Sequence, residues 1–539
     1  MPRHRNLIIS VCLAALAACG GQNESAFEDE PDAAVVLHRG NGGEPDTLDP
    51  HRNEESSGAE ILRDLFEGLT TETVDARIVP GSAESWVSSD DGLVYTFSLR
   101  PEARWSNGDP LLADDFVAGL RRTVDPNTAS TYAQILYPIE NAQAVVTGRL
   151  PPTALGVRAL DARTLEIRLA APTPYILGLL AHSSTYPIHR ASLAEHGSRF
   201  PRPGNLISNG AYRLTEWVVQ SHIKLERNDY YWNNEQVQID TVYYHATEDV
   251  DAELRRYRAG ELDFTFRFPV SQYQWILENL PGELHTEPYI STYFYGFDTT
   301  EPPFDDPRLR QALSMVVDRQ RIARDVVGAG QLPAFGLVPP GVANYQGVSY
   351  TWTTLDTQAR LAEARRLYAA AGYSPANPLS VEIRYNTSEN HQRIAIAVAS
   401  MWKEHLGVDA RLINQEWKVM LQTRQDTSAW QVMRYGWIGD YNDAFTFLEI
   451  FQSTHGQNFT GFADSRYDEL LAAAARQPDL ERRTELMRLA EQRVLDAYPI
   501  VPVYFYTNKH LVKPYVRGFR ANIMDHNYSR HFRIERNSQ

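Results

Sequence analysis

Hydrophobic and polar positions in the second half of the chain repeat with two different periods. Leu379–Tyr385 (LSVEIRY) alternates as a half-buried strand does, Ile394–Trp402 places its apolar residues on one face of a helix, and Val408–Ile413 alternates again. Strands that follow one another through a helix are typical of a sheet covered by helices. We therefore predict α/β architecture for this half of the chain.

Two helices in this half are marked by signals at their ends. The first would begin with Asp306 as its N-cap and Pro307 at its first position, and would run to Gly328. The second would run from Asp356 to Ala371 and stop at the glycine that follows.

In the first half of the chain the hydrophobic runs are shorter. Between residues 90 and 174 we predict brief strands at Leu93–Leu99 and Leu165–Leu169. The chain has 539 residues, and a single hydrophobic core stops growing at about 250–300 residues. We therefore expect two or more lobes, with the region 90–174 forming a smaller one.

One segment, Arg434–Asp443 (RYGWIGDYND), combines a base, an acid, glycines and aromatic residues. If it is a strand, Arg434, Gly436, Ile438 and Asp440 share one face. An extended guest along that face would meet a carboxylate at one end and a guanidinium further along, and the bare glycine would let its backbone pair like an added strand. The segment alone equally fits a core strand whose Arg and Asp form a local ion pair.

The N-terminus predicts export. Arg3 and Arg5 precede an apolar run from Leu7 to Ala18, which is typical of a signal peptide and shorter than the roughly 20 residues that cross a bilayer. Small residues before Cys19 indicate a lipobox, in which that cysteine becomes the lipidated first residue; an ordinary secretory signal is the alternative. Residues 20–34 are polar, acidic and without periodicity, as a tether is.

Cysteine usage and charge exclude several classes of site. The chain has 2 cysteines, of which Cys12 lies in the segment to be removed, so the mature protein would have no disulfide, zinc-thiolate site or cysteine nucleophile. With 52 Lys+Arg against 68 Asp+Glu the formal net charge is −16. No run of basic residues is long enough for a nucleic-acid footprint, so we expect no nucleic-acid partner.

An enzyme acting on peptides is the first competing function, and the sequence gives it no support. It contains no G-x-S-x-G, H-E-x-x-H or Walker loop. The acidic pairs Asp114-Asp115 and Asp305-Asp306 fall at predicted helix starts, where acids act as caps. We therefore expect no catalytic residues, no metal site and no cofactor.

Motifs along the whole chain resemble those of the family 5 extracellular solute-binding proteins, and the later ones resemble its oligopeptide-binding branch in particular. Any one motif would be weak evidence, but about a dozen follow one another in order. They are Glu44–Pro50, Asp64–Thr70, Gly81–Trp86, Tyr95–Phe116, Ile207–Leu214, Arg227–Asn234, Tyr257–Phe264, Pro303–Arg319, Asn386–His391, Asn414–Lys418 and Ile500–Tyr506.

This resemblance implies a three-lobed periplasmic binding protein-like fold, in which two main lobes are hinged by two crossover strands and a smaller domain is added. The crossings would fall near Tyr289–Thr292 and Tyr506–Thr507. After a signal peptide (1–18) and a lipid-anchored tether (19–34), domain I would comprise residues 35–66, 191–291 and 508–539, domain II residues 67–190, and domain III residues 292–507.

The resemblance also implies roles for charged residues. Asp440 matches the aspartate that holds a peptide's α-ammonium, and Arg434 the arginine that reads a C-terminal carboxylate, for which a planar fork of donors is suited. His391 matches a histidine assigned to the carboxylate of longer peptides. Glu54 matches an acid that pairs with the Arg434-type residue across the cleft.

The remaining implied contacts are made by backbone groups and uncharged side chains. Gly436 and Ile438 would supply backbone hydrogen bonds, which are blind to sequence, and Ser56 matches a residue whose backbone pairs with the peptide. Trp417, Tyr132 and Trp437 would line side-chain pockets wide enough to hold water and many different side chains.

By the same resemblance the protein would be a monomeric protein of the periplasm. Relatives are often soluble, so the membrane anchor is implied by Cys19 and departs from the family pattern. It would deliver short peptides to the permease and ATPase subunits of an inner-membrane ABC importer. Two alternatives remain besides the secreted peptidase: the same fold with another guest, such as a dipeptide, murein peptide or metal chelate, and a receptor or chaperone-like module without transport.

Overall fold

The computed structural model describes residues 34–424, 426 and 429–535, and from Val35 onward the chain forms one compact unit. The predicted signal peptide, Cys19 and most of the tether lie outside the described residues. In the described part, no helix is both long and apolar enough to cross a membrane.

The predicted domain I contains a four-stranded sheet in the order β1 (Val36–Gly40), β10 (Thr241–His245), β9 (His222–Arg227) and β8 (Tyr212–Val218). β1 is parallel to β10, and the other neighbours are antiparallel. Helix α1 (Ser56–Leu65) contacts β8. Burial alternates along β10, as expected for a sheet with one face on the core.

The predicted domain II contains an antiparallel sheet in the order β4 (Ala83–Ser88), β5 (Val94–Leu99), β7 (Thr164–Arg168) and β6 (Val157–Ala159), covered by α2 (Ala113–Val124). The two strands that the sequence predicts here are confirmed. Asp115 accepts a hydrogen bond from the Leu112 N–H (3.0 Å), so this acid has the predicted place at a helix start.

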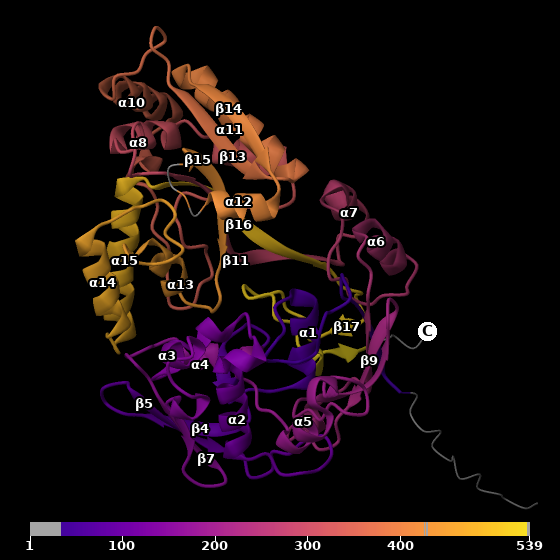
Figure 1. The fold of residues 1–539 in the computed structure, drawn as a ribbon. Helices are drawn as coiled ribbons and strands as arrows, with labels where there is room; N and C mark the ends of the chain where they lie inside the picture. Colours follow the sequence, from indigo (N-terminus) through magenta and orange to yellow (C-terminus); the bar gives the residue numbers. More distant parts are fainter. Residues whose placement is uncertain (1–33, 425, 427–428, 536–539) are drawn as a thin grey trace, which may run out of the picture. The chain divides into compact units, whose positions relative to one another are not determined.

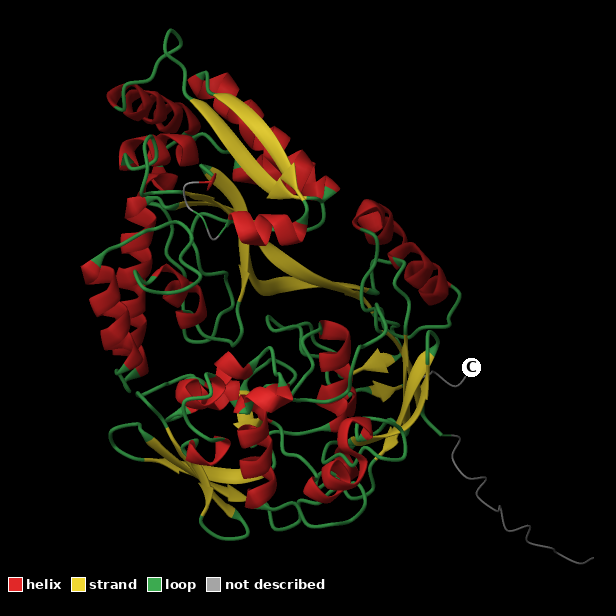
Figure 2. Ribbon diagram, in the orientation of Figure 1, coloured by secondary structure: helices red, strands yellow, loops and turns green. Residues whose placement is uncertain are grey.

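The predicted domain III is built on a six-stranded sheet, and its alternation of strands and helices is the one that the sequence predicts (Figures 1 and 2). The helices around it are α8 (Pro307–Met315), α10 (Thr357–Ala370) and α11 (Glu389–Leu406). In order, the strands are β12 (Leu332–Pro333), β16 (Ile500–Leu511), β11 (Leu284–Phe297), β15 (Val432–Ile438), β13 (Ser380–Asn386) and β14 (Asp409–Gln415).

Two strands of this sheet are much longer than the others. β11 has 14 residues and β16 has 12, and they pair antiparallel from Leu284↔Leu511 to Gly296↔Ile500. In Figure 1 they extend from the sheet toward α6 (Val250–Arg258) and α7 (Tyr273–Asn279). Their pairing is irregular between Pro288 and Thr292. The predicted crossings lie on these two strands, while the domain boundaries themselves remain predictions.

The single helix predicted from Pro307 to Gly328 is wrong in its length. α8 ends at Met315, α9 (Arg319–Arg321) follows after a break, and a π-helical stretch (Ile322–Val327) leads to Gly328. The break arises because Asp318 caps α9 by accepting the Arg321 N–H (2.9 Å). Buried Arg319 then reaches the carbonyl of Pro502 (2.7 Å), a contact that a continuous helix pattern does not reveal.

The remaining regular elements connect these sheets or cover them (Figure 1). They are β2 (Thr70–Glu72), β3 (Ile78–Pro80), α3 (Ala142–Val146), α4 (Ile176–Leu179), α5 (Arg190–His196), α12 (Trp417–Thr423), α13 (Phe445–Leu448), α14 (Ser465–Ala475), α15 (Leu480–Ala497), β17 (Val516–Arg517) and β18 (Arg533–Ile534).

Candidate functional site

Two adjoining cavities form one cleft. The first, the β15 chamber, has a volume of ≈ 700 Å³ and reaches β15 and Asp440, and the second, the Lys509 chamber, has a volume of ≈ 640 Å³ and reaches the end of β16. Their volume suits a peptide-sized guest more than a single ion. Their shared lining is Ser56, Arg63, Tyr132, His182, Tyr289, Tyr506, Met524 and His526.

One edge of β15 is open at the cleft. β11 pairs with the whole strand, from Ile438 to Val432, whereas β13 pairs only with Val432 and Met433. In the described chain, residues 434–438 therefore have no strand partner on their second edge. Their N–H and C=O groups on that edge can pair with an extended guest.

Gly436 keeps this edge clear. A Cβ atom there would lie 3.3 Å from the Thr292 carbonyl oxygen and 3.5 Å from Arg434 Nη2, so any side chain would fill the space above the strand. Ile438, on the same face, is 55% exposed. The predicted strand is confirmed, although it ends at Ile438, and Asp440 lies in the loop two residues beyond.

Arg434 stands at the other end of the open edge. Its Nη2 donates to the Tyr506 hydroxyl (2.9 Å), its Nη1 donates to Asn386 Oδ1 (3.3 Å), and its guanidinium lies 4.7 Å from the centre of the Tyr293 ring. Its Nε–H has no partner. No carboxylate in the described part of the chain pairs with it, so a fixed positive charge lines the β15 chamber without a counterion.

Asp440 supplies the opposite charge. Its backbone N–H donates to Thr446 Oγ1 (3.4 Å), and its side chain forms no ion pair within the described ranges. The surrounding protein removes this carboxyl from bulk water and raises its pKa to about 6, although water in the cleft still reaches its surface. A cationic guest group would relieve this unfavourable environment.

Glu449 lies close enough to be coupled to Asp440, and sequence reasoning missed it. Burial raises its pKa to about 7, the hydroxyl of Tyr441 opposes this through a 2.9 Å hydrogen bond, and the negative charge of Asp440 raises it further. The acid stands in a hydrophobic stretch with no motif to mark it. Its electrostatic coupling to Asp440 becomes apparent only in the folded structure.

His391 lies beside Arg434, in the first turn of α11. Its ring centre is 5.5 Å from that of Tyr293, and burial together with the charge of Arg434 lowers its pKa to about 3. The imidazole is therefore neutral at physiological pH. It can donate or accept a hydrogen bond in this guest-free conformation. The role implied by the resemblance, binding the carboxylate of longer peptides, stays a prediction.

The predicted pair between Glu54 and Arg434 is not formed in this structure. Glu54 lines the Lys509 chamber, and no ion pair between described residues joins it to Arg434. Ser56 and Tyr132 line both chambers. Burial raises the pKa of Tyr132, and the negative charges of Asp440 and Glu54 add to this, so both acids act on its hydroxyl.

Of the two tryptophans predicted to line pockets, the structure describes the side chain of Trp437 and not that of Trp417. Trp437 lines the β15 chamber, and its indole N–H donates to Thr446 Oγ1 (3.2 Å), which fixes the ring next to the Asp440 loop. Trp417 begins α12, but its side chain lies outside the part of the structure that is described.

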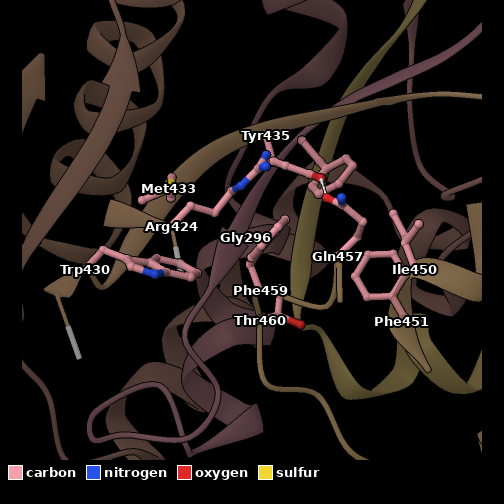
Figure 3. Close-up of a pocket in the computed structure, with 11 residues that line it drawn as sticks. Gly296, Arg424, Trp430, Met433, Tyr435, Ile450, Phe451, Gln457, Phe459 and Thr460 are labelled. Carbon is pink, nitrogen blue, oxygen red and sulfur yellow. Dashed lines mark hydrogen bonds between the residues drawn. The ribbon is translucent and has the colours of Figure 1, made fainter. Parts of the chain in front are cut away.

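A ring-lined side pocket opens behind β15 (Figure 3). It shares Arg424, Tyr435 and Gln457 with the β15 chamber. The Arg424 guanidinium lies 4.0 Å from the centre of the Phe459 ring, and the Tyr435 hydroxyl donates to Gln457 Oε1 (3.1 Å). The aromatic and apolar residues here are scattered between 294 and 460, which is why the sequence does not reveal the pocket.

The family model of the bacterial extracellular solute-binding proteins, family 5 (middle region), matches residues 77–459. The chain belongs to this family. It is 39% identical to the periplasmic oligopeptide-binding protein OppA of Escherichia coli (strain K12), over 98% of each chain. The prediction from the sequence, a solute-binding protein with an α/β lobed fold, is confirmed.

Solved structures place the family fold over nearly the whole described chain. The murein tripeptide-binding protein MppA in its unliganded open form matches with a TM-score of 0.86 at 40% identity, covering 94% of this chain and 100% of that one. Haemophilus influenzae OppA in complex with the peptide RPPGFSPFR matches with a TM-score of 0.75 at 37% identity, over 94% and 100%. The conformation described here is thus nearer to the unliganded open form than to that complex.

The described residues contain no group of three or more His, Cys, Asp and Glu side chains that could hold a metal ion. The groups that line the β15 chamber are one acid, one base, an open strand edge and aromatic walls. They are suited to binding a zwitterionic chain.

Proposed function

We propose that this family 5 solute-binding protein captures short peptides with free ends and delivers them to an ABC importer. One observation carries the proposal: the open edge of β15, with Gly436 at its centre, lies between an unpaired carboxylate, Asp440, and an unpaired guanidinium, Arg434. An extended peptide has the matching groups, which are an ammonium, a row of backbone donors and acceptors, and a carboxylate.

The two charges give the guest a direction and a length. Its N-terminus would lie at Asp440 and its C-terminus at Arg434, so the guest runs antiparallel to β15. Six residues of extended chain span roughly 20 Å at most, and both charged side chains lean into the chamber, so the site suits guests of about three to five residues. Because backbone pairing does not read side chains, we expect many different sequences to bind.

The cellular setting follows from the N-terminus and from the family. The protein would be a periplasmic lipoprotein anchored through Cys19 and would work with a permease and an ATPase subunit as its partners. Replacing the cysteine (Cys19→Ala) should convert a detergent-phase protein into a soluble or unprocessed one. Unchanged partitioning with membranes would show that the lipobox interpretation is wrong.

Murein peptides are a second candidate guest class. The specific observation in their favour is that the murein tripeptide-binding protein MppA is as similar in sequence to this chain, at 40% identity, as the oligopeptide-binding protein OppA is, at 39%. Such guests share a free ammonium and carboxylates with ordinary peptides, so Asp440 and Arg434 would serve both.

Mass spectrometry of the guests released by denaturing the purified protein tests the proposed function. We expect a mixed population of peptides of about three to five residues, and much less of it from Gly436→Val, in which the open edge is blocked. A single non-peptide solute, released equally by both proteins, would contradict the proposal. A single tripeptide rich in acidic groups would favour the murein class.

A further inference from the structure

The Lys509 chamber differs from the β15 chamber in its walls and in its charges. Its walls come from three separate parts of the predicted domain I, from Tyr132 and His182 of the predicted domain II, and from the end of β16. No residue of the open β15 edge reaches it. Its lining beyond the shared wall is Asn53, Glu54, Glu55, Ala59, Glu60, Val250, Phe266, Arg267, Phe268, Pro269, Val270, Thr507, Asn508, Lys509, His510 and Asp525.

Most charged groups around this chamber have partners within the protein. Glu60 pairs with Arg39 (2.9 Å) and with Arg63 (2.8 Å), and His510 pairs with Asp525 (2.6 Å).

Three further groups in the wall of this chamber are also either paired within the protein or uncharged. His526 pairs with Glu72 (2.6 Å), and Glu55 accepts the backbone N–H of Asp46. Burial and the charge of Arg63 lower the pKa of His182 to about 3, so that ring is neutral. These groups cannot bind a charged guest without losing a contact that they already make.

Two cations of the chamber have no such partner. Lys509 is half-buried, and its Nζ donates to one neutral acceptor, the Thr507 carbonyl (2.9 Å), with no carboxylate in ion-pair distance in the described structure. Arg267 is exposed, and its guanidinium lies 5.0 Å from the centre of the Phe266 ring. No acid pairs with it in the described ranges. Glu54, an exposed acid of the wall, and Glu55 have no cation partner within the described ranges.

Lys509 is held in an unfavourable environment. Burial lowers its pKa to about 8, while the more distant charge of Asp525 acts in the opposite direction. A half-buried ammonium with a single neutral acceptor has lost hydration that nothing in the protein replaces. A carboxylate of a bound guest would replace this lost hydration with a charge-assisted hydrogen bond.

A guest in the β15 chamber can reach this ammonium. Tyr506, which bonds Arg434, and Lys509 lie on the same strand, three residues or roughly 10 Å apart. The two chambers meet at the wall that includes Ser56, Tyr132 and Tyr289. Tyr506 and Lys509 both line the Lys509 chamber. A guest side chain that points away from β15 can therefore project through this junction, where the long side chains of Lys509 and Arg267 can meet it.

We propose that Lys509, assisted by Arg267, forms a subsite for an acidic side chain, so that guests with Asp or Glu at one internal position are preferred. This inference rests on the proposed peptide-binding function and narrows its substrate class. Backbone pairing alone accepts any sequence, whereas an unpaired ammonium in a recessed chamber favours a carboxylate over the isosteric amide. A charge-assisted contact of this kind should give about a tenfold preference.

The test is calorimetry with matched tetrapeptides that carry Glu or Gln at each internal position in turn. Wild-type protein should bind one Glu peptide about tenfold more tightly than its Gln counterpart. Lys509→Met, which keeps the length of the side chain and removes its charge, should abolish this preference and leave binding of the Gln peptide unchanged. The control Lys403→Met changes an exposed lysine of α11 outside both chambers and should keep the preference.

Peptide amidation separates the two sources of a carboxylate. Amidating the C-terminus should weaken binding to wild type and to Lys509→Met by the same factor, because Arg434 reads that end. If the Lys509→Met effect vanishes with amidation instead of with Glu→Gln, the lysine reads the terminus and the side-chain subsite is refuted. Equal weakening of Glu and Gln peptides would refute it as well. If wild type binds none of the peptides, the proposed function fails, and the subsite fails with it.

Discussion

Asp440 and Arg434 carry opposite charges that no other described side chain neutralises. In a folded protein such charges are usually paired, because an uncompensated charge in a recessed place is unfavourable. Their separation along an open strand edge supports the proposal that both bind one extended guest. Under that proposal, the guest-free protein has an electrostatic cost at this site that the charges of the guest would relieve.

The raised pKa of Asp440 predicts how binding depends on pH. Without guest its pKa is about 6, and a bound ammonium lowers it, so protonation competes with binding below pH 6. The dissociation constant of a free-ended peptide should therefore rise about tenfold from pH 7 to pH 5. Titration calorimetry at several pH values measures this.

The matched control is Asp440→Asn, which should lose that part of the pH dependence. Glu449, whose pKa is raised to about 7, still titrates in the variant, so the difference between the two curves isolates Asp440. Parallel curves would show that this carboxylate does not bind the guest's ammonium.

Gly436→Val should separate binding from folding. The new side chain would fill the face on which a guest backbone lies, and two unmade buried hydrogen bonds at roughly 1–2 kcal/mol each weaken binding by about 100-fold. The thermal midpoint should fall only modestly, because strands tolerate valine but a Cβ here would lie 3.3 Å from the Thr292 carbonyl oxygen. Gly282→Val is the control, since a Cβ there meets no atom within 4 Å. Wild-type affinity in Gly436→Val would exclude the open edge as the binding surface.

At this scale the sequence reveals residues that stand in motifs and misses those assembled by folding. Arg434, Gly436 and Asp440 are close in sequence and could be predicted together. Lys509 could not, because the walls of its chamber come from segments hundreds of residues apart. Glu449 could not either, although Asp440 and Tyr441 are near it in the sequence, because burial, not residue type, perturbs the pKa of both groups.

At the scale of elements, the binding site depends on β11, which holds β15 along one edge, and on β13, which leaves the other edge free after Met433. Edge strands are commonly protected against pairing with other chains. Here the edge faces the inside of a cleft. It is therefore accessible to a short peptide and shielded from a second folded protein.

Glu491 should be the element-scale determinant of stability. It is fully buried on α15 and accepts four hydrogen bonds, from the backbone N–H groups of Leu337 (2.9 Å), Val338 (2.9 Å) and Val348 (3.0 Å) and from the hydroxyl of Tyr345 (2.7 Å). Glu491→Ala leaves these donors unpaired and should lower the free energy of unfolding by about 3–5 kcal/mol in urea titrations.

Glu485→Ala on the same helix is its control. That glutamate is exposed and pairs only with Arg488 (3.4 Å), so the loss should stay below about 1 kcal/mol. Similar losses in both variants would mean that the Glu491 network does not hold the segment 337–348 to α15.

Periodicity predicts these elements well where local signals agree and fails where a distant contact decides. α10, capped by Asp356, and the strands β13 and β14 have the predicted places. The helix after Asp306 breaks partly for a local reason, since Asp318 caps the next turn through the Arg321 N–H. It also breaks because buried Arg319 donates to the distant Pro502 carbonyl, a contact that no local pattern contains.

At the scale of the whole molecule, β11 and β16 join the sheet of the predicted domain III to the predicted domain I. Their pairing is irregular at Pro288–Thr292, where the predicted crossing falls. Two strands with a local irregularity can bend without unfolding either lobe. The order of the motifs suggested this architecture, but the arrangement of side chains around the cleft required the folded chain.

Peptide binding should bring the lobes together about this hinge, because only a closed state contacts a guest on both sides. Small-angle scattering of guest-free protein should show a smaller radius of gyration after a free-ended tripeptide is added. Gly436→Val at the same peptide concentration should not change. An identical radius with and without peptide in the wild type would contradict the hinge.

The pairing of Asp440 with the guest's amine is the most direct test of peptide binding. Calorimetry should measure wild type and Asp440→Asn, each with a free and an N-acetylated form of one peptide. Removing one partner of such a pair costs roughly 2–5 kcal/mol, or about 30-fold to several thousand-fold in affinity. We predict that acetylation and Asp440→Asn each cause this loss and that both together cause little more. Strictly additive losses would show that Asp440 does not hold the ammonium, and the proposed direction of the peptide would be wrong.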